Sequence, residues 1–512
     1  MRQIPEGWSS AVLGDVARWA SGGTPSRTNR SFFLGEIPWI KTGELGAQYL
    51  HSAEEHISQE AVNSSAAKVF PKGTVVLAMY GATIGKASIL AFDASTNQAC
   101  AAGLPEGVGA LFLHYFLLSQ REAFVEAGKG GAQPNISQGI VKDWPILVPP
   151  RAEQTRIVDK LEELLSDLDA GVAELKAAQK KLAQYRQSLL KAAVEGRLTE
   201  AWRAQRSPEA DSEESGAQLL ARILRERRAR WEAKQLAKFE AQGKAPPKGW
   251  QDKYSEPIAP NLRGLSELPK GWSWVSLDML GEIASGVAKG TKRDEKIVVR
   301  EVPYLRVANV QRGYLDLSEV KTILANERDI AELTLEEGDV LFNEGGDRDK
   351  LGRGWVWRSE VPSCIHQNHV FRMRPLFPEL QPELISHHGN TFGKLWFQTA
   401  GKQTTNLASI NMGMLREFPV PLAPVAEQAE ILDQLQLQLV AVAEQGASIE
   451  YALRQSAAQR KNILRSAFSG QLVPQDPNDE PASALLARIR AERGAQSQAG
   501  GASRRQRRVA SE

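Results

Sequence analysis

A leucine recurs at every seventh position along the middle of the chain, between residues 152 and 194. A sustained seven-residue apolar repeat is typical of a helix that packs against another helix in a coiled coil. A similar repeat between residues 425 and 470 predicts a second long helix and an antiparallel pair within the chain. One amphipathic helix packed on its own domain is a weaker interpretation, because the repeat occurs in both halves. The predicted coiled-coil seam consists of Leu161, Leu168, Leu175, Leu182, Leu189, Leu435, Val442, Ile449 and Ile463.

The residues before each long helix have a different pattern. Residues 1–150, called the first domain, and residues 268–424, the second domain, are rich in Gly, Pro and short apolar runs. Runs such as residues 74–78 and 340–342 predict strands. Residues 111–127 place apolar side chains on one helical stripe and predict a helix packed on the sheet. The predicted fold class is therefore α+β, with two mixed α/β domains separated by two long helices that form an antiparallel coiled coil.

The chain contains an internal duplication, so its two halves share one order of domain and helix. Matching segments are residues 4–8 with 268–272, 136–145 with 410–419, 152–154 with 426–428, and 219–223 with 485–489. The offset between the copies is steady along the helices and drifts inside the domains, where loops would differ if one scaffold bound two targets. The predicted parts are the first domain at 1–150, a long helix at 151–196, a charged connecting segment with a basic helix at 197–267, the second domain at 268–424, a second long helix at 425–470, and a C-terminal helix-like segment with a basic tail at 471–512.

Composition narrows the class of protein. The chain has 512 residues, of which 42% are hydrophobic and 24% charged, as in globular proteins of several domains. Two cysteines exclude a disulfide framework. The absence of a long apolar run and of a signal-peptide pattern predicts a cytoplasmic protein without a membrane span. The net charge of +2 hides a strongly basic segment at residues 218–239, which is predicted to be either a docking helix for a partner or a solvated amphipathic helix.

No catalytic or metal-binding pattern stands out. The sequence lacks the glycine-rich cofactor turn and the Asn/Asp-Pro-Pro-aromatic motif that an adenine methyltransferase needs. Residues 81–87 resemble a phosphate loop but have three residues between the glycines and no Ser or Thr after Lys86. His366 and His369 are three residues apart, which places them on opposite faces of a strand and disfavours a shared metal ion. We predict no cofactor, no metal and no catalytic residue.

The repeated PxGW opening, the domain ending NISQGIVKDWPILVPP and the following AEQ helix resemble the specificity subunit of type I restriction-modification systems. The resemblance covers residues 4–196 and 268–472, and it implies that both domains are target-recognition domains. Each would read one half of a bipartite sequence in double-stranded DNA, while the paired helices set the spacing. Adenine methylation and DNA cleavage would belong to partners, namely methyltransferase (modification) subunits and a restriction (motor/nuclease) subunit. The connecting segment is longer than the family's minimal layout requires.

Candidate DNA contacts are polar and cationic residues of the domain loops. Lysines and arginines would hold phosphates, whereas amides and hydroxyls would choose bases. For Gln367 and Asn368, and for the similarly placed Asn97 and Gln98, a buried amide that ties loops together is an equally good interpretation. The candidates are Lys41, Thr42, Tyr80, Thr83, Lys86, Gln98, Gln133 and Asn135 in the first domain, and Arg306, Asn309, Arg348, Lys350, Gln367, Asn368, Gln403 and Thr405 in the second.

Two other functions remain open at this point. A coiled-coil scaffold whose two domains bind protein or glycan is compatible with the modest net charge. A self-sufficient nuclease or methylase is the weakest alternative, because its catalytic motifs are missing.

Overall fold

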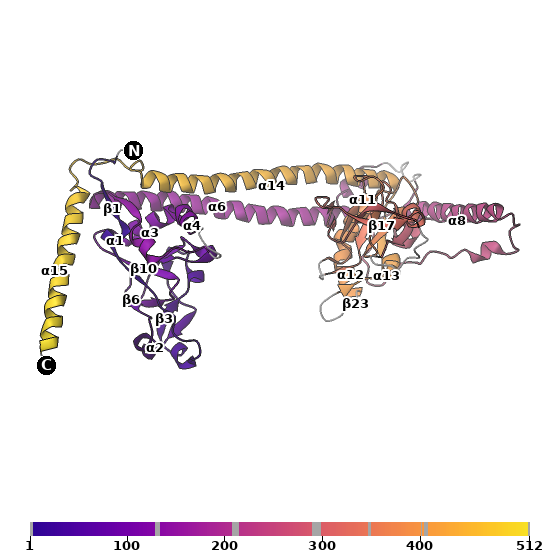
Figure 1. Ribbon diagram of the computed structural model, residues 1–512. Helices are drawn as coiled ribbons and strands as arrows, with labels where there is room; N and C mark the ends of the chain where they lie inside the picture. The colour runs from indigo at the N-terminus through magenta and orange to yellow at the C-terminus, as the bar shows by residue number, and fades with distance from the viewer. Residues whose placement is uncertain are drawn as a thin grey trace. The chain divides into compact units, whose positions relative to one another are not determined.

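The computed structural model describes residues 4–128, 134–206, 214–288, 298–346, 350–400, 402–403 and 408–509. The chain forms two compact units, Met1–Ala177 with Ile449–Glu512 and Ala178–Ser448. Each unit therefore contains one globular domain and a stretch of both long helices (Figure 1). No helix in the described ranges is both long and apolar enough to cross a membrane.

The first unit holds a mixed α/β domain and the C-terminal helix. Its strands are β1 (Ser9–Val12), β2 (Ala17–Ser21), β3 (Ile37–Ile40), β4 (Tyr49–Leu50), β5 (Glu55–Ile57), β6 (Val69–Phe70), β7 (Val75–Ala78), β8 (Ala87–Leu90), β9 (Ala94–Thr96), β10 (Cys100–Pro105) and β11 (Pro145–Val148). Its helices are α1 (Leu13–Val16), η1 (Arg30–Phe33), η2 (Thr42–Glu44), α2 (Gln59–Ser64), η3 (Gly81–Thr83), α3 (Ala110–Ser119), α4 (Arg121–Ala127), α5 (Gln138–Lys142) and α15 (Ala482–Val509). The helix predicted at residues 111–127 is thus two helices, because Gln120 leaves the helical region with φ −92° and ψ 0°.

The second unit repeats this plan with more short strands. Its strands are β12 (Ser273–Ser276), β13 (Gly281–Ser285), β14 (Val299–Leu305), β15 (Val310–Gln311), β16 (Tyr314–Leu315), β17 (Lys321–Asn326), β18 (Val340–Asn343), β19 (Gly345–Gly346), β20 (Gly354–Val356), β21 (Ile365–His366), β22 (Val370–Pro375), β23 (Lys402–Gln403), β24 (Ala408–Ser409) and β25 (Pro419–Leu422). Its helices are α7 (Glu200–Gln205), α8 (Gly216–Ala241), η5 (Trp250–Lys253), α9 (Leu277–Leu280), α10 (Glu327–Leu333), α11 (Pro382–Asn390), α12 (Phe392–Ala400) and α13 (Met412–Glu417).

Two sheets build the body of each domain. In the first domain they have the orders β2-β10-β7-β8-β4 and β5-β3-β9-β6, and in the second β13-β22-β18-β20 and β17-β14-β21. Alternation along β7 explains the layers, since Val75 and Leu77 pack in the core that contains α3, while Val76 and Ala78 pack in a second core with Ile40. A strand covered on both faces reads as a continuous apolar run, which is why residues 74–78 were recognisable.

The two long helices are α6 (Arg151–Val194) and α14 (Val425–Ala467). In each unit a stretch of α6 packs antiparallel against a stretch of α14 (Figure 1). The Arg460 guanidinium bonds Asp169 in the first unit, and the Tyr185 hydroxyl donates to Gln438 Oε1 at 3.1 Å in the second. Of the predicted seam, Leu161, Leu189 and Leu435 are buried and the other members are half-buried, as expected where a helix has one helical neighbour.

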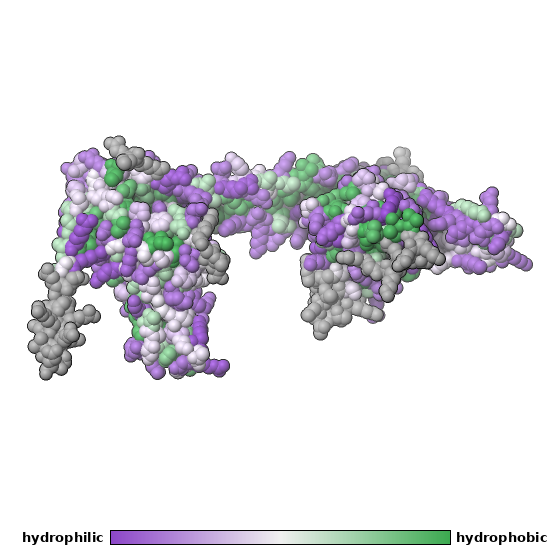
Figure 2. Space-filling model, viewed as in Figure 1, coloured by the Kyte–Doolittle hydropathy of each residue, from purple (hydrophilic) through white to green (hydrophobic). Residues whose placement is uncertain are grey.

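The basic helix α8 packs on the second domain through its N-terminal half. Leu219 and Ile223 are fully buried in the domain core, and the Arg227 guanidinium bonds the backbone carbonyl of Asp278 and lies 3.6 Å from that residue's carboxylate. The rest of α8 has a mostly hydrophilic surface (Figure 2). This half of α8 is therefore an integral part of the domain, and the docking or solvated role of the basic segment stays a prediction for the rest of the helix.

The C-terminal helix α15 does the same for the first domain. Leu485 and Ile489 are buried against it, and Arg493 Nη1 donates to the carbonyl of Gly14 at 2.7 Å. The backbone N–H of Ala482 donates to the carbonyl of Gly7 at 2.9 Å, as that of Gly216 does to Gly271 at 2.7 Å in the second unit. The repeated segment after each long helix thus serves as a matching strap on each domain.

Candidate nucleic-acid interface

A buried glutamate fastens each domain to the start of its long helix. In the first unit Trp8 Nε1 donates to Glu153 Oε2 at 3.0 Å, and Gln475 Nε2 donates to Glu153 Oε1 at 3.3 Å. Burial raises the pKa of Glu153, because the charged form loses its water. In the second unit Trp272 Nε1 donates to Glu427 Oε2 at 2.8 Å. The repeated tryptophan and glutamate thus hold the scaffold on which the candidate loops are mounted.

The C-terminal ends of two parallel strands form one candidate edge of the first domain. Strand β3 runs parallel to β9, so the residues that follow them, Lys41 after β3 and Asn97 and Gln98 after β9, lie at the same edge of the sheet. Asn97 Oδ1 is buried without a hydrogen-bond partner among the described residues, and Gln98 is exposed and accepts a bond from the Thr24 hydroxyl. The Asn97 and Gln98 amides are therefore close neighbours at a loop surface.

Lys41 has two carboxylates at this edge. Its Nζ lies 2.9 Å from Glu54 Oε2 and 3.0 Å from Glu55 Oε1, and these hydrogen bonds hold the pKa of Lys41 above its usual value. Arg27 also bonds Glu55 at 2.7 Å, and together with Lys41 it holds the pKa of Glu55 below its usual value. A lysine that is already paired twice is a poor phosphate ligand, which argues against the role predicted for Lys41. Thr42 follows as the first residue of η2 and is half-buried.

The turn between β7 and β8 brings together a second group of candidates. Tyr80 is 44% exposed and forms an antiparallel bridge with Asn135, and the Thr83 hydroxyl donates to the Tyr80 carbonyl at 2.8 Å. Lys86 is half-buried, and its ammonium makes no ion pair with a described residue. This turn thus presents a phenol, a hydroxyl, an amide and an ammonium next to one another. Gln133 lies outside the described residues.

The second domain has the same parallel-strand edge. Strand β14 runs parallel to β21, which places Arg306 after one and Gln367 and Asn368 after the other. Gln367 and Asn368 are half-buried, and their side-chain amides make no hydrogen bond to a described residue. Arg306 pairs with Glu319 at 3.2 Å, and this contact lowers the pKa of Glu319. The amides at this edge are therefore available, while the cation is again held by an acid.

Asn309 is a structural residue. Its side chain is 2% exposed, donates to the carbonyls of Asp316 and Glu319 at 2.9 Å each, and accepts from the Arg306 backbone N–H at 2.9 Å. These bonds use the amide inside the domain, which argues against the base contact predicted at this position.

The second domain also contains a small sheet of order β19-β24-β23. Lys350 follows the gap after β19 and is half-buried. Gln403 belongs to β23, but its side chain is outside what the structure describes, as are residues Arg348 and Thr405 altogether. Of the neighbouring histidines, His366 is fully buried at the end of β21, whereas His369 is exposed beside Glu344 in the turn that follows, so the two do not share a strand.

Some residues at these edges gave no recognised signal in the sequence. Gly22 and Gly286 directly follow β2 and β13 and lie very close to another segment of the same chain. An added Cβ would lie 2.1 Å from Thr96 Oγ1 at Gly22 and 2.0 Å from the His366 carbonyl oxygen at Gly286. The available clue was that Ser21-Gly22 recurs in the second half as Ser285-Gly286. The guanidinium carbon of Arg27 lies 4.3 Å from the centroid of the Phe33 ring, and no sequence motif indicates this contact.

Comparison with known proteins identifies the scaffold. Residues 5–177 match the family model described as the type I restriction modification DNA specificity domain. The specificity subunit of the type I restriction enzyme EcoKI of Escherichia coli strain K12 is 25% identical over 96% of this chain and 97% of its own length. The EcoDI specificity subunit of Escherichia coli is 26% identical over 90% of this chain and 94% of its own length. The chain belongs to the type I restriction-modification specificity-subunit family.

The fold agrees with this family. A chain in a solved structure of a type I R-M system, concerned with complex assembly and conformational transition, superimposes with a TM-score of 0.62 at 17% identity and covers 92% of this chain and 99% of that one. The specificity subunit is the non-catalytic component that gives such a system its DNA target.

Proposed function

We propose that each domain of this specificity subunit reads one half of a bipartite sequence in double-stranded DNA. The observation that supports this is the pair of equivalent edges, with amides at Asn97 and Gln98 in one domain and at Gln367 and Asn368 in the other. Both edges stand at the ends of parallel strands on a repeated scaffold, while the residues around them differ. Carboxamides are suited to adenine, which offers an acceptor and a donor in the major groove.

The proposal assigns phosphate contacts to other residues than those paired with acids. Lys86 at the β7–β8 turn is the best such residue in the first domain, because no described carboxylate neutralises it. It lies next to Tyr80 and Asn135, which supply groups for base or sugar contacts. In the second domain Lys350 and residues Arg348, Gln403 and Thr405 keep their proposed roles as DNA contacts.

The chemistry is proposed to reside in partner subunits. Methyltransferase subunits would methylate adenine in the recognised sequence, and a restriction subunit would move along and cleave unmodified DNA, so the complex would act in the cytoplasm. Helix α6 has 44 residues, about 66 Å at 1.5 Å per residue. We propose that the length of the two helices fixes the gap between the half-sites, which would be roughly two turns of DNA.

Mapping of methylated adenines tests the division of labour. We expect the double variant Gln367→Ala with Asn368→Ala to relax one half of the methylated motif and to leave the other half unchanged, with a loss of about 1–3 kcal/mol of discrimination per contacted base pair. Asn97→Ala with Gln98→Ala should relax the opposite half. Asn478→Ala, which removes an exposed amide away from both edges, is the control. Loss of specificity in both halves from one double variant would contradict the proposal.

A further inference from the structure

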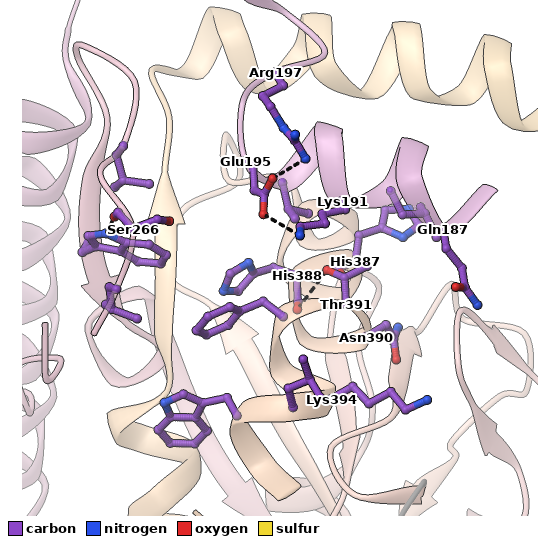
Figure 3. Close-up of a pocket in the computed structure, with 18 of the residues that line it drawn as sticks. Gln187, Lys191, Glu195, Arg197, Ser266, His387, His388, Asn390, Thr391 and Lys394 are labelled. Atoms are coloured by element: carbon purple, nitrogen blue, oxygen red, sulfur yellow. Dashed lines mark hydrogen bonds and ion pairs between the residues drawn. The ribbon is translucent and has the colours of Figure 1, made fainter. Parts of the chain in front are cut away.

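A cavity of about 930 Å³ opens on the second unit, and none of the candidate DNA-reading residues lines it. It lies between the C-terminal end of α6, residues 263–268, and helices α11 and α12 (Figure 3), and we call it the helix-end groove. Its apolar lining is formed by Leu190, Val194, Trp274, Phe392, Leu395 and Trp396. Leu395 is 70% exposed and adds to the apolar surface of the groove.

The rim of the helix-end groove is cationic. Glu195 pairs with Arg197 at 2.5 Å and with Lys191 at 3.8 Å, as the dashed lines in Figure 3 show. The other charged residues of the lining are Glu267 and the cations Arg186, Arg263, Arg312 and Lys394. The side chains of Arg186, Arg263 and Lys394 form no ion pair within the described residues. The rim therefore has an excess of positive charge around an apolar floor.

The first unit shows what fills the equivalent position. Phe468 at the end of α14 lies at the same offset of 274 that relates Gly196 to Gly470, so it corresponds to Val194 in the second unit. The Phe468 ring packs edge-on against Phe112 and Phe116 of α3, with centroids 5.4 Å apart in both cases. Helix α11, which takes the place of α3, contains no phenylalanine. The second unit thus has the smaller Val194 where the first has Phe468, and Val194 lines the helix-end groove.

The ion pairs differ in the same way. In the first unit Arg460 bonds Asp169 and Lys461 bonds Glu122. At the offset of 274, Arg186 corresponds to Arg460, whereas Asp169 corresponds to Ala443. The second unit has therefore kept the cation and lost the carboxylate that would neutralise it.

We infer that the helix-end groove binds an acidic amphipathic segment of a protein partner. One aromatic or leucine side chain of that segment occupies the space that Phe468 fills in the first unit, and its carboxylates pair with Arg186 and Lys394. An aromatic-lined pocket with a charged rim is the arrangement that anchors protein interfaces, whereas a phosphate backbone would leave the apolar floor uncovered. The inference does not depend on which residues read DNA.

A designed peptide tests the inference on the full-length protein. The probe is a fluorescein-labelled 16-residue helical peptide with Phe and Leu on one face and Glu flanking them, and its matched control has Gln in place of Glu. We expect the Glu peptide to bind at least ten times more tightly than the Gln peptide by fluorescence anisotropy. Val194→Phe, which installs the residue of the first unit, should weaken binding of the Glu peptide at least tenfold, and so should Lys394→Glu.

Controls separate loss of the groove from loss of the fold. Arg328→Glu reverses a cation on α10 that is exposed and does not line the groove, so it should bind the peptide like the unaltered protein. Cys364, buried in the same unit, should stay protected from a thiol reagent in every variant. The inference is overturned if the two peptides bind equally or if Val194→Phe binds normally. It is also overturned if a DNA duplex displaces the peptide and Val194→Phe weakens binding of that duplex to the protein, since the groove would then bind nucleic acid.

Discussion

The two units are built on one scaffold but bury different titratable groups. The second buries three histidines, His366, His387 and His388, whereas the first buries only His114. Burial lowers the pKa of each of the four rings to about 4. Two rings of the second unit donate hydrogen bonds to backbone carbonyls. His388 Nε2 donates to the Pro419 carbonyl at 2.8 Å, and His366 Nδ1 donates to the Val370 carbonyl at 2.6 Å.

The two glutamates that fasten the domains to the long helices, Glu153 and Glu427, also have different hydrogen-bond partners. Glu153 is bonded by Trp8 and Gln475, both neutral. Glu427 is bonded by Trp272, by the Thr199 hydroxyl at 2.7 Å and by the Arg203 guanidinium. The comparison teaches that duplication preserved the groups that hold each domain on its helix, while the charge balance around them was free to change. The second unit should consequently respond more strongly to changes in protonation.

The largest expected effect is acid destabilisation of the second unit. A histidine whose folded pKa is about 4 and whose ordinary pKa is 6.5 stabilises the fold fully above pH 6.5, and this contribution is lost as the pH falls towards 4. Each such histidine corresponds to about 3 kcal/mol over that range. We expect hydrogen exchange, corrected for its intrinsic rate at each pH, to show the second unit losing protection between pH 6.5 and 4 much more steeply than the first.

Single substitutions test whether the histidines cause this difference. His387→Gln should reduce the pH dependence of the second unit by about one third, because it removes one of three buried rings. His369→Gln changes an exposed ring and should leave the dependence as it is. Equal pH dependence of the two units would show that the buried histidines do not control acid stability.

The next effect concerns the two glutamates. Glu427→Gln leaves Arg203 without its buried carboxylate and should cost the second unit about 2–4 kcal/mol. Glu153→Gln keeps an oxygen for Trp8 and relieves the burial of a charge, so it should change the first unit by less than about 1 kcal/mol. Cys100 and Cys364 are buried, one in each unit, so pulsed thiol labelling during urea unfolding reports the units separately. If Glu153→Gln destabilised the first unit more than Glu427→Gln destabilises the second, the expected difference between the two glutamates would be wrong.

The sequence was most informative where the pattern is periodic or repeated. The seven-residue spacing predicted α6 from residue 152 to residue 194, and the helix extends over Arg151–Val194. The apolar runs predicted β7 and β18, and the equivalence of Gln98 with Asn368 placed both at matching strand ends. These features depend on local spacing or on comparing the two copies, and both can be read directly from one sequence.

The remaining features depend on side chains that meet across the fold. Lys41 was predicted to bind phosphate, but the return of the chain at Glu54 and Glu55 neutralises it. The sequence around Asn309 is typical of a polar loop, yet the Asn309 side-chain amide forms hydrogen bonds with three backbone groups. The role of α8 depends on Leu219 and Ile223 packing on the domain, and its many arginines obscured that apolar face. No spacing rule indicates these tertiary partners.

The smallest effect should be the same in both units. Gly196 and Gly470 end the two long helices with φ of +69° and +75°, and an added Cβ would lie 2.8 Å from Pro269 Cγ in one case and 2.5 Å from Pro5 Cγ in the other. Ala at either position should cost about 1–2 kcal/mol, because it must adopt a left-handed conformation and displace a proline ring. Gly43→Ala meets no atom within 4 Å and is the control. Matched losses at Cys364 for Gly196→Ala and at Cys100 for Gly470→Ala would show that the helix ends are the preserved part of the duplication, whereas a loss in one unit alone would mean that this fastening has diverged as well.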